Sequence, residues 1–396
     1  MFTKTMHQQV FILACAQALF QIVYVAIMTI GALAGAAMSG SARWATLPIA
    51  TMFLGTAVMM FPASIWMAKV GRRMGFLAGA LLGTVGGLIA SMGILENSLA
   101  ILGLGTFFIG CYKAFAQFYR FAASEIAAPG FRPRAISLVL AGGVAAALIG
   151  PVLAQVGGQL MQPYYLGSFL LIALVALMSV GVLQGFHVPP VYATVPHHNA
   201  PARSLLRIVA QPSYLVALFG GATSYGIMIM AMTATPLAML YHDHELGTAA
   251  IVIQLHVLGM FLPSFFTGSL ITRFGVLRIM LVGALLFAAH ILITMTGTGF
   301  VSFVSSLTLL GVGWNFMYIG STTLLTSTYT PQEKARAQAT NDMAIFIVGV
   351  ACAFSAGWLL ETIGWASMNL MLLPWLGLSV LSIIWLGLHQ RRIHAE

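Results

Sequence analysis

Long apolar segments follow one another along nearly the whole chain, and short polar or Pro/Gly-containing stretches separate them. Most of these segments reach or exceed the roughly 20 residues that a helix needs to cross a bilayer, and tilt accommodates the longer ones. Helices are expected because backbone polar groups in lipid must be satisfied within the spanning segment. The pattern predicts an all-α membrane protein with twelve transmembrane helices over residues 9–37, 45–68, 74–94, 99–123, 134–158, 165–186, 212–240, 248–271, 277–297, 300–327, 337–360 and 367–388.

The longest polar, proline-bearing stretch, HVPPVYATVPHHNAPARS from His187 to Ser204, divides the chain into two sets of six helices. We therefore expect an N-terminal bundle over 1–186, a cytoplasmic linker over 187–211 and a C-terminal bundle over 212–396. The two halves also repeat sequence. SIWMAKVGRR begins at Ser64 and GSLITRFGVLR at Gly268, an offset of 204, while RPRA and KARA recur at an offset of 202. Two matched halves predict a transporter with its substrate site between them, near mid-membrane.

Charge placement gives an orientation. Of the 396 residues, 60% are hydrophobic and 6% are charged, against about 25% charged in soluble domains. With both termini in the cytoplasm, Arg43 is the one basic loop residue outside, while Glu96, Asp243, Glu245 and Glu361 are external. The net charge of +9 is thus a positive-inside signal and not a nucleic-acid footprint. We expect a monomer embedded in lipids of a bacterial inner membrane. The cytoplasmic basic residues are Lys4, Lys69, Arg72, Arg73, Arg132, Arg134, Arg203, Arg207, Arg273, Arg278, Lys334, Arg336, Arg391 and Arg392.

Residues suited to metal binding or covalent catalysis are sparse. Cys15, Cys111 and Cys352 all lie in apolar segments, without the spacing of a disulfide framework or a zinc site. YHDHE, from Tyr241 to Glu245, has ligand-type residues but no matching partners, and we interpret it as a solvated loop. The chain has no H-E-x-x-H and no paired membrane aspartates, so an intramembrane enzyme is disfavoured. We expect no metal and no cofactor.

The loop after the second predicted helix resembles a motif of the major facilitator superfamily, G-x-x-x-D-R-x-G-R-R. Lys69 stands at its acidic position, and Thr272 does so in the second copy. The resemblance covers essentially the whole chain and implies the fold of that superfamily, with two six-helix bundles that rock against each other. The remaining matched positions are Ser64, Ala68, Gly71, Arg72 and Arg73 in the first copy, and Gly268, Arg273 and Gly275 in the second.

In that family the motif residues help to lock the cytoplasmic ends of the halves together. Lys69, Gly71, Arg72, Arg73, Arg273 and Gly275 are therefore candidate gating residues. Asp342 could supply the missing carboxylate to Lys69 or Arg72. The alternative is that these basic residues only set topology.

A second likeness is to the glycine-proline motif of drug/proton antiporters. AGGVAAALIGPVLAQVGG contains Gly150 and Pro151, but its spacing departs from that motif. Small residues also allow close helix packing whatever the function. We interpret both residues as packing and bending features.

Polar residues inside the predicted fourth helix point to a ligand. Lys113, Gln117 and Arg120 are spaced i, i+4 and i+7, so they share one helix face, with Lys113 near the midplane. Arg120 could instead extend to the cytoplasmic interface. A buried lysine is costly to insert, and no carboxylate is expected at its depth. The pattern predicts an uncompensated cation in a water-accessible cavity, which would attract an anion.

In the resembled family, helices one, four, seven and ten line the central cavity. Three of these carry polar faces here, and the seventh adds Tyr225. Each residue could equally form an interhelical hydrogen bond. The mixture of cations, amides and aromatics suits a carboxylate- or phosphate-bearing organic solute. The further candidates are Gln17, Gln21 and Tyr24 on the first helix, and Gly311, Trp314, Asn315, Tyr318 and Thr322 on the tenth.

Coupling to protons requires a titrating group, for which Asp342, His256 and His290 are the candidates. Buried histidines can also be purely structural. The leading hypothesis is a proton-coupled, alternating-access transporter of a small organic anion. A drug/proton antiporter of amphipathic compounds is the alternative, favoured by 23 methionines. A membrane sensor without turnover is a third.

Overall fold

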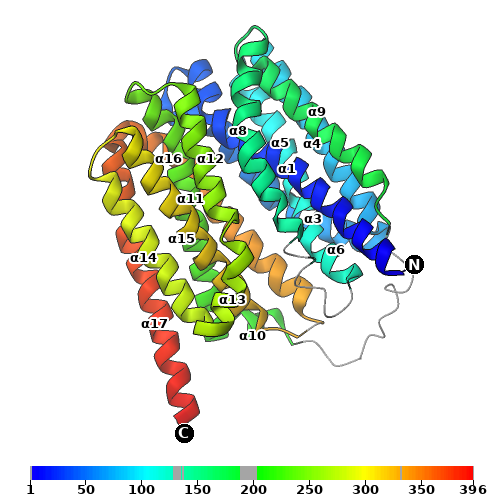
Figure 1. Cartoon of the computed structure of the whole chain (residues 1–396), viewed down its shortest axis with the longest axis vertical. Helices are drawn as coiled ribbons and strands as arrows, with labels where there is room; N and C mark the ends of the chain where they lie inside the picture. Colours follow the sequence, from blue (N-terminus) through cyan, green and yellow to red (C-terminus); the bar gives the residue numbers. More distant parts are fainter. Residues whose placement is uncertain (1, 128–134, 136–137, 188–202, 331, 396) are drawn as a thin grey trace.

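The computed structural model describes residues 2–127, 135, 138–187, 203–330 and 332–395, and all regular structure in that part of the chain is helical. The helices form two groups that lie side by side, one from each half of the sequence, and both termini lie at the same end of the molecule (Figure 1). We call this the termini end.

The first half contains α1 (Phe2–Ser39), α2 (Ala42–Ala45), α3 (Leu47–Val70), α4 (Arg72–Leu95), α5 (Leu99–Ala116), α6 (Tyr119–Ile126), α8 (Gly142–Leu160) and α9 (Leu166–Gln184). The second contains α10 (Leu205–Val209), α11 (Pro212–Tyr241), α12 (Leu246–Phe261), α13 (Ser264–Phe274), α14 (Val276–Thr294), α15 (Phe300–Thr326), α16 (Lys334–Leu370) and α17 (Leu373–Ala395).

The helices account for the predicted membrane spans. In the described part of the chain, ten helical segments are long and apolar enough to cross a bilayer, or eleven if the bent pair α12 and α13 forms one span. One of the ten runs over 56 residues from Arg336 to Arg391 and joins α16 to α17. A helix of that length would measure about 84 Å, far more than the roughly 30 Å of a bilayer core. The backbone also leaves the helical region at Gly364, which has φ 77°. The segment therefore holds two spans, and the prediction of twelve is confirmed.

Corresponding helices of the two halves make corresponding contacts. α3 and α4 pack on α5 in the first half, as α12 and α14 pack on α15 in the second; α1 packs on α8 as α11 packs on α16. The repeat extends to the turns. Gly71 joins α3 to α4 with φ 86°, and Gly275 joins α13 to α14 with φ 89°. Only glycine adopts this backbone region readily, so the repeated glycines build the same sharp turn 204 residues apart.

Two predicted helices are interrupted. The predicted helix 248–271 is bent by 41° between α12 and α13, next to Pro263. Proline lacks a backbone N–H and its ring crowds the preceding turn, which explains the bend. The predicted helix 99–123 is interrupted at Gln117 and Phe118, where the Phe118 N–H bonds to the carbonyl of Phe115, three residues back. Lys113 on α5 and Arg120 on α6 therefore lie on either side of a tight turn within one candidate span, Leu99–Ala123.

The halves contact each other at the end opposite the termini. α3 packs against α16 and α8 against α12. Glu361 of the second half accepts hydrogen bonds from the backbone N–H of Arg43, at 3.0 Å, and from the Ser41 hydroxyl, at 3.1 Å. Beside this contact the rings of Trp44 and Phe354 meet edge to face, 5.9 Å apart. This end is therefore held closed by contacts between the halves.

At the termini end, Glu333 ties the chain before α10 to the start of α16. Its carboxylate accepts two side-chain hydrogen bonds from Arg203, at 2.7 and 2.9 Å, and one from the Thr330 N–H at 2.9 Å. The Glu333 side chain is only 2% exposed. These donors, the Arg203 guanidinium first and the Thr330 N–H second, hold the pKa of Glu333 well below its usual range. The predicted linker 187–211 includes residues 188–202, which lie outside the described residues, so its boundaries stay a prediction.

The lowered pKa of Glu333 predicts an acid-sensitive contribution to stability. Because the folded pKa lies below the unfolded value of about 4.3, the contribution is complete above that value and is lost as pH falls toward the folded pKa. We expect Glu333→Gln to lower the melting temperature at pH 7 and to flatten its fall between about pH 5 and pH 3. Thermal unfolding of both proteins in one detergent measures this. Parallel curves for the two proteins over that pH range would contradict it.

Candidate functional site

Lys113 of α5 is enclosed between the two halves and is 3% exposed. Its Nζ donates a hydrogen bond to the Tyr225 hydroxyl on α11, at 3.0 Å. The ammonium lies 4.1 Å from the ring centroids of both Tyr24 and Phe53, and 5.3 Å from that of Phe346. Aromatic faces attract a cation, by roughly 2 kcal/mol for a desolvated contact. In the described part of the chain no carboxylate lies within ion-pair distance of Lys113.

The predicted water-accessible cavity does not surround Lys113 in this conformation, because ring faces and one hydroxyl enclose the ammonium. The prediction that no carboxylate neutralises it fits the geometry. Sequence reasoning missed Phe53 and Phe346, since a phenylalanine in an apolar segment is indistinguishable from one that faces lipid. A lysine expected inside the membrane without a carboxylate needs other partners. That expectation could have directed attention to aromatic residues on neighbouring helices, since ring faces attract cations.

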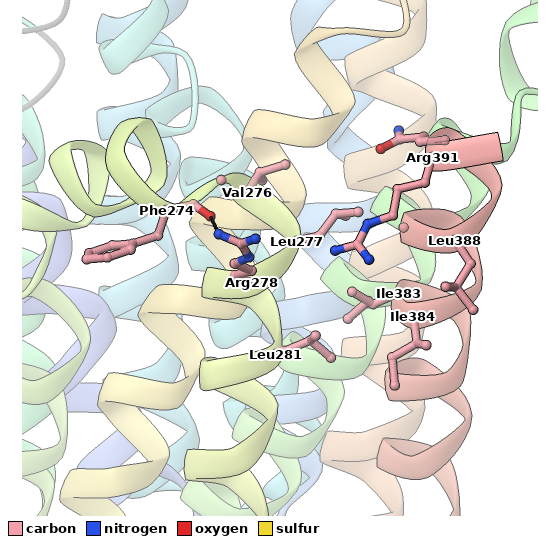
Figure 2. Close-up of a pocket in the computed structure, with 12 residues that line it drawn as sticks. Phe274, Val276, Leu277, Arg278, Leu281, Ile383, Ile384, Leu388 and Arg391 are labelled. Atoms are coloured by element: carbon pink, nitrogen blue, oxygen red, sulfur yellow. Dashed lines mark hydrogen bonds between the residues drawn. The ribbon is translucent and has the colours of Figure 1, made fainter. Parts of the chain in front are cut away.

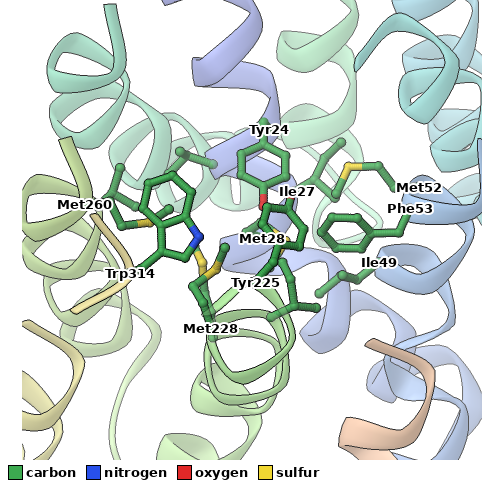
Figure 3. Close-up of a cluster of buried hydrophobic side chains, with 14 of the residues drawn as sticks. Tyr24, Ile27, Met28, Ile49, Met52, Phe53, Tyr225, Met228, Met260 and Trp314 are labelled. Atoms are coloured by element: carbon green, nitrogen blue, oxygen red, sulfur yellow. The ribbon is translucent and has the colours of Figure 1, made fainter. Parts of the chain in front are cut away.

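The aromatic cluster continues into the second half. Tyr225 contacts Tyr318 at 5.9 Å between ring centroids, and Tyr318 stacks on Trp314 at 4.8 Å with an interplanar angle of 13°. Figure 3 shows Tyr24 and Tyr225 lying between Trp314 and Phe53, with Met28, Met228 and Met260 around them. Four predicted residues, Tyr24, Tyr225, Trp314 and Tyr318, thus lie together with Lys113. We call Lys113, Tyr24, Phe53, Tyr225, Phe346, Tyr318 and Trp314 the aromatic cluster.

Several polar groups near this cluster have no protein partner. The indole Nε1 of Trp314 is buried without a hydrogen-bond acceptor among the described residues. On α1, Gln17 and Gln21 precede Tyr24 by seven and three residues, so the three share a helix face. Both glutamines are buried, and neither side chain has a hydrogen-bond partner among the residues that the structure describes. Gln117, at the break between α5 and α6, is half-buried. Unused donors and acceptors of this kind are suited to a ligand.

Asn315 has a different environment from the one expected of a substrate contact. Its Nδ2 donates to the carbonyl of Met260 at 2.6 Å and to the Ser264 hydroxyl at 2.7 Å, and its Oδ1 accepts from Thr267 at 2.6 Å. These groups flank the bend at Pro263, where the helical hydrogen bonds are interrupted. Asn315 thus replaces the missing backbone partner, which favours a structural role, and we do not include it in the proposed site.

His256 and His290 both lie in the interior of the second half. Each ring Nδ1 faces a backbone carbonyl of α15, of Leu307 at 2.8 Å for His256 and of Ser306 at 3.0 Å for His290. A carbonyl can only accept, so each Nδ1 carries a proton. Both residues connect helices within one half, an arrangement typical of structural histidines. Their role in coupling stays a prediction without support from this geometry.

Arg120 and Asp342 form an ion pair across the two halves, from α6 to α16. Their closest side-chain nitrogen and oxygen are 3.7 Å apart, and the side chains are 19% and 16% exposed. Asp342 also accepts a hydrogen bond from Asn341 at 3.1 Å. The predicted pairing of Asp342 with Lys69 or Arg72 is therefore wrong, because Arg120 occupies its carboxylate. Arg120 does not extend freely to the membrane surface, which was the alternative for this residue.

The remaining gating candidates lie at the termini end. Arg72 pairs with Glu125 at 2.7 Å, and Arg73 donates to the carbonyl of Gln184 at 2.8 Å, both within the first half. Lys69 is exposed at the end of α3. Arg273 lies over the ring of Phe274, 5.3 Å from its centroid. None of these contacts joins the two halves, so a gating role for these residues stays a prediction. Within the described residues, no group of three His, Cys, Asp or Glu side chains is arranged to hold a metal.

Comparison with known proteins gives consistent matches. Residues 217–395 match the family model of the Major Facilitator Superfamily. The riboflavin transporter RfnT of Brucella anthropi is 38% identical over 368 residues, which cover 93% of this chain and 92% of that protein. Two proteins of Bacillus subtilis, YdeG and YddS, are 29% and 28% identical, over 87% and 88% of this chain and 84% and 85% of their own lengths. Both are named uncharacterized MFS-type transporters.

The similarity extends over nearly the full length and agrees with the repeated halves and the twelve spans. The protein is therefore an integral membrane protein that carries a small-molecule substrate and is not an enzyme. The predicted family and fold are confirmed. The chain belongs to the major facilitator superfamily of secondary transporters.

Proposed function

We propose that this protein transports riboflavin, or a closely related flavin, across a bacterial inner membrane by proton-coupled alternating access. Its 38% identity with a riboflavin transporter supports the substrate class. An even number of spans places both termini on one side, and the excess of Lys and Arg at that end favours the cytoplasm. The proposal retains the predicted coupling to protons and the two-bundle mechanism.

The observation that carries the substrate proposal is the parallel pair Trp314 and Tyr318 beside unused polar groups. Riboflavin contains a flat tricyclic ring, and flat rings stack on aromatic side chains with offset, nearly parallel planes. Trp314 and Tyr318 are held at 13°, so their outer faces present suitable surfaces once the halves separate. The ring of riboflavin also carries two carbonyls and an imide N–H along one edge. The amides of Gln17 and Gln21 offer both donors and acceptors for such an edge.

Lys113 is the third group that we expect to contact the flavin. Its ammonium is the strongest donor in the aromatic cluster and could bond a ring carbonyl of an uncharged flavin. The same group would suit the phosphate of a flavin mononucleotide, which corresponds to the organic anion expected from the sequence. A comparison of riboflavin with its phosphate therefore distinguishes an uncharged flavin substrate from the organic anion expected from the sequence.

Alternating access gives a role to the contacts between the halves. Glu361, Ser41 and Arg43 join the halves at the external end, and Arg120 and Asp342 join them at the other. In the proposed cycle these contacts break and re-form in turn. Protonation of Asp342 would remove its attraction to Arg120, which links proton movement to separation of the cytoplasmic ends.

The test is uptake of radiolabelled riboflavin by a bacterial strain that can neither make nor import it. Expression of this protein should restore uptake, and an excess of unlabelled riboflavin should compete. Trp314→Ala should lower uptake about tenfold, because a lost stacking contact of roughly 1.5 kcal/mol corresponds to that factor. Trp385→Ala is the matched control, since Trp385 is 52% exposed on α17 and lies outside the aromatic cluster. Wild-type uptake by Trp314→Ala, or no uptake by the expressed wild type, would contradict the proposal.

A drug/proton antiporter is the second candidate, favoured by the methionines around Trp314. Met28, Met228 and Met260 are flexible and polarisable, as expected of a site that adapts to several ligands. Export of a cationic dye that riboflavin does not inhibit would support this candidate against the first.

A further inference from the structure

A groove between α14 and α17 lies on the outer side of the second half, at the termini end. Its volume is about 790 Å³, and its walls come from the first two turns of α14 and the last turns of α17. Figure 2 shows two arginines, Arg278 and Arg391, on facing helices on either side of Leu277, with Ile383, Ile384 and Leu281 farther down in the view. The groove thus combines an apolar wall with two cations beside it.

The two arginines lack the carboxylate partners found elsewhere at this end. Arg72, Arg120 and Arg203 each pair with an acid, at 2.7, 3.7 and 2.7 Å. Arg278, in contrast, has one long hydrogen bond of 3.4 Å to the carbonyl of Phe274 in the preceding turn. Arg391 forms no hydrogen bond or ion pair with any described residue, and no acidic residue is among those described that line the groove. Two cations on facing helices therefore share an opening in which no described residue supplies an anion.

The apolar wall below the arginines continues toward the middle of the membrane. Ile384 and Leu388 on α17 are 43% and 53% exposed, and Leu285, one turn beyond Leu281 on α14, is 69% exposed. In a bilayer this surface faces lipid tails. A ligand that occupies the whole groove must therefore carry an anionic head and a long apolar tail.

We infer that this groove binds an anionic phospholipid, with its phosphate between Arg278 and Arg391 and its acyl chains along α14 and α17. Guanidinium groups bind phosphate oxygens through paired N–H donors, and basic pockets between helices near a membrane surface favour anionic headgroups. The occupied groove would connect α17 to α14, the helix that follows the turn at Gly275. The inference is independent of the transported substrate.

Thermal unfolding of the purified full-length protein in detergent tests the inference. Phosphatidylglycerol should raise the melting temperature by several degrees more than phosphatidylcholine does, because a ligand that binds the folded form stabilises it. Arg278→Gln combined with Arg391→Gln should lose most of that difference. Arg207→Gln is the matched control, since Arg207 is exposed at the same end and lies outside the groove. Equal responses to the two lipids in the wild type would overturn the inference.

Two further measurements separate a lipid from a free anion and guard against misfolded variants. Inorganic phosphate at the same concentration should give little stabilisation; if it matches the lipid, the groove is an anion site and the inference is wrong. The second measurement is amide hydrogen exchange of the wild-type protein, which avoids variants that could misfold. Phosphatidylglycerol should slow exchange in peptides covering 276–284 and 383–391 more than in α4 and α9, which also face lipid. Uniform slowing over all outer helices would indicate general solvation and overturn the inference.

Discussion

Replacing Lys113 with glutamine is expected to lower riboflavin uptake at least tenfold while the protein stays folded in the membrane. A hydrogen bond to a charged group contributes roughly 1.5–3 kcal/mol, and 1.4 kcal/mol corresponds to a factor of ten in binding. Folding should tolerate the change because no carboxylate lies within ion-pair distance, so no opposite charge is left buried. The Tyr225 hydroxyl loses its charged donor, and the rings of Tyr24 and Phe53 lose their cation. Uptake by intact cells and binding by quenching of flavin fluorescence measure the effect.

Arg207→Gln provides the control for this experiment, because Arg207 is an exposed basic residue outside the aromatic cluster and is not a gating candidate. It should take up riboflavin at the wild-type rate. Lys113→Arg keeps the charge but enlarges the group within a cage of rings 4.1 Å away, so it should remain impaired if geometry as well as charge matters. An active Lys113→Gln protein would show that this ammonium has no part in transport.

The same variant distinguishes a flavin from a flavin phosphate as substrate. If Lys113 binds a phosphate, its loss should weaken competition by flavin mononucleotide more than competition by riboflavin. Equal weakening would indicate that Lys113 contacts the ring system that both molecules share. The prediction of an organic anion as substrate would then be wrong, although Lys113 would still take part in substrate binding.

The helices of this protein follow from its apolar segments because a bilayer requires long apolar helices whatever their partners. The turns were harder to predict. Gly71 and Gly275 were found because both recur in matched loops, and both have positive φ. The positions of prolines, by contrast, did not predict where helices bend. Pro151 lies inside the uninterrupted helix α8, while Pro263 accompanies a bend. At Pro263, Asn315 supplies hydrogen bonds to the bent segment, and such a contact from another helix cannot be read from local sequence.

For a similar reason, the polar residues of the candidate site could be predicted from the sequence but their partners could not. Polar residues in apolar helices are rare, so Lys113 and Arg120 could be singled out from their spacing, and Tyr225 through the resemblance to the family. Their partners could not. Phe53 and Phe346 look like any lipid-facing residue, and Arg120 meets Asp342 from a helix 222 residues away. Pairing between the halves depends on how the bundles are placed relative to each other, which no local pattern encodes.

Asp342→Asn is expected to reduce riboflavin uptake driven by an inward proton gradient at least tenfold, while exchange of internal for external riboflavin continues. In the proposed proton-coupled cycle, exchange requires only that the loaded protein reorients, whereas net uptake also requires release of the proton. The amide can neither take up a proton nor form an ion pair with Arg120. Since the Arg120–Asp342 pair is 3.7 Å long, it is already looser than the 2.7 Å pair of Arg72 and Glu125. Proteoliposomes with an imposed gradient, compared with counterflow, measure the two activities.

Glu125→Gln is the matched control, because it breaks an arginine–carboxylate pair on the same helix α6 but within one half. It should leave gradient-driven uptake unchanged, and an equal loss in both variants would remove the special role of Asp342. A charge exchange, Arg120→Asp with Asp342→Arg, then separates two functions of the pair. If the pair acts only as a contact between the halves, the exchanged pair should restore gradient-driven uptake. If Asp342 carries the proton at a fixed position on α16, the exchange should restore counterflow alone, because the carboxylate has moved to the other half.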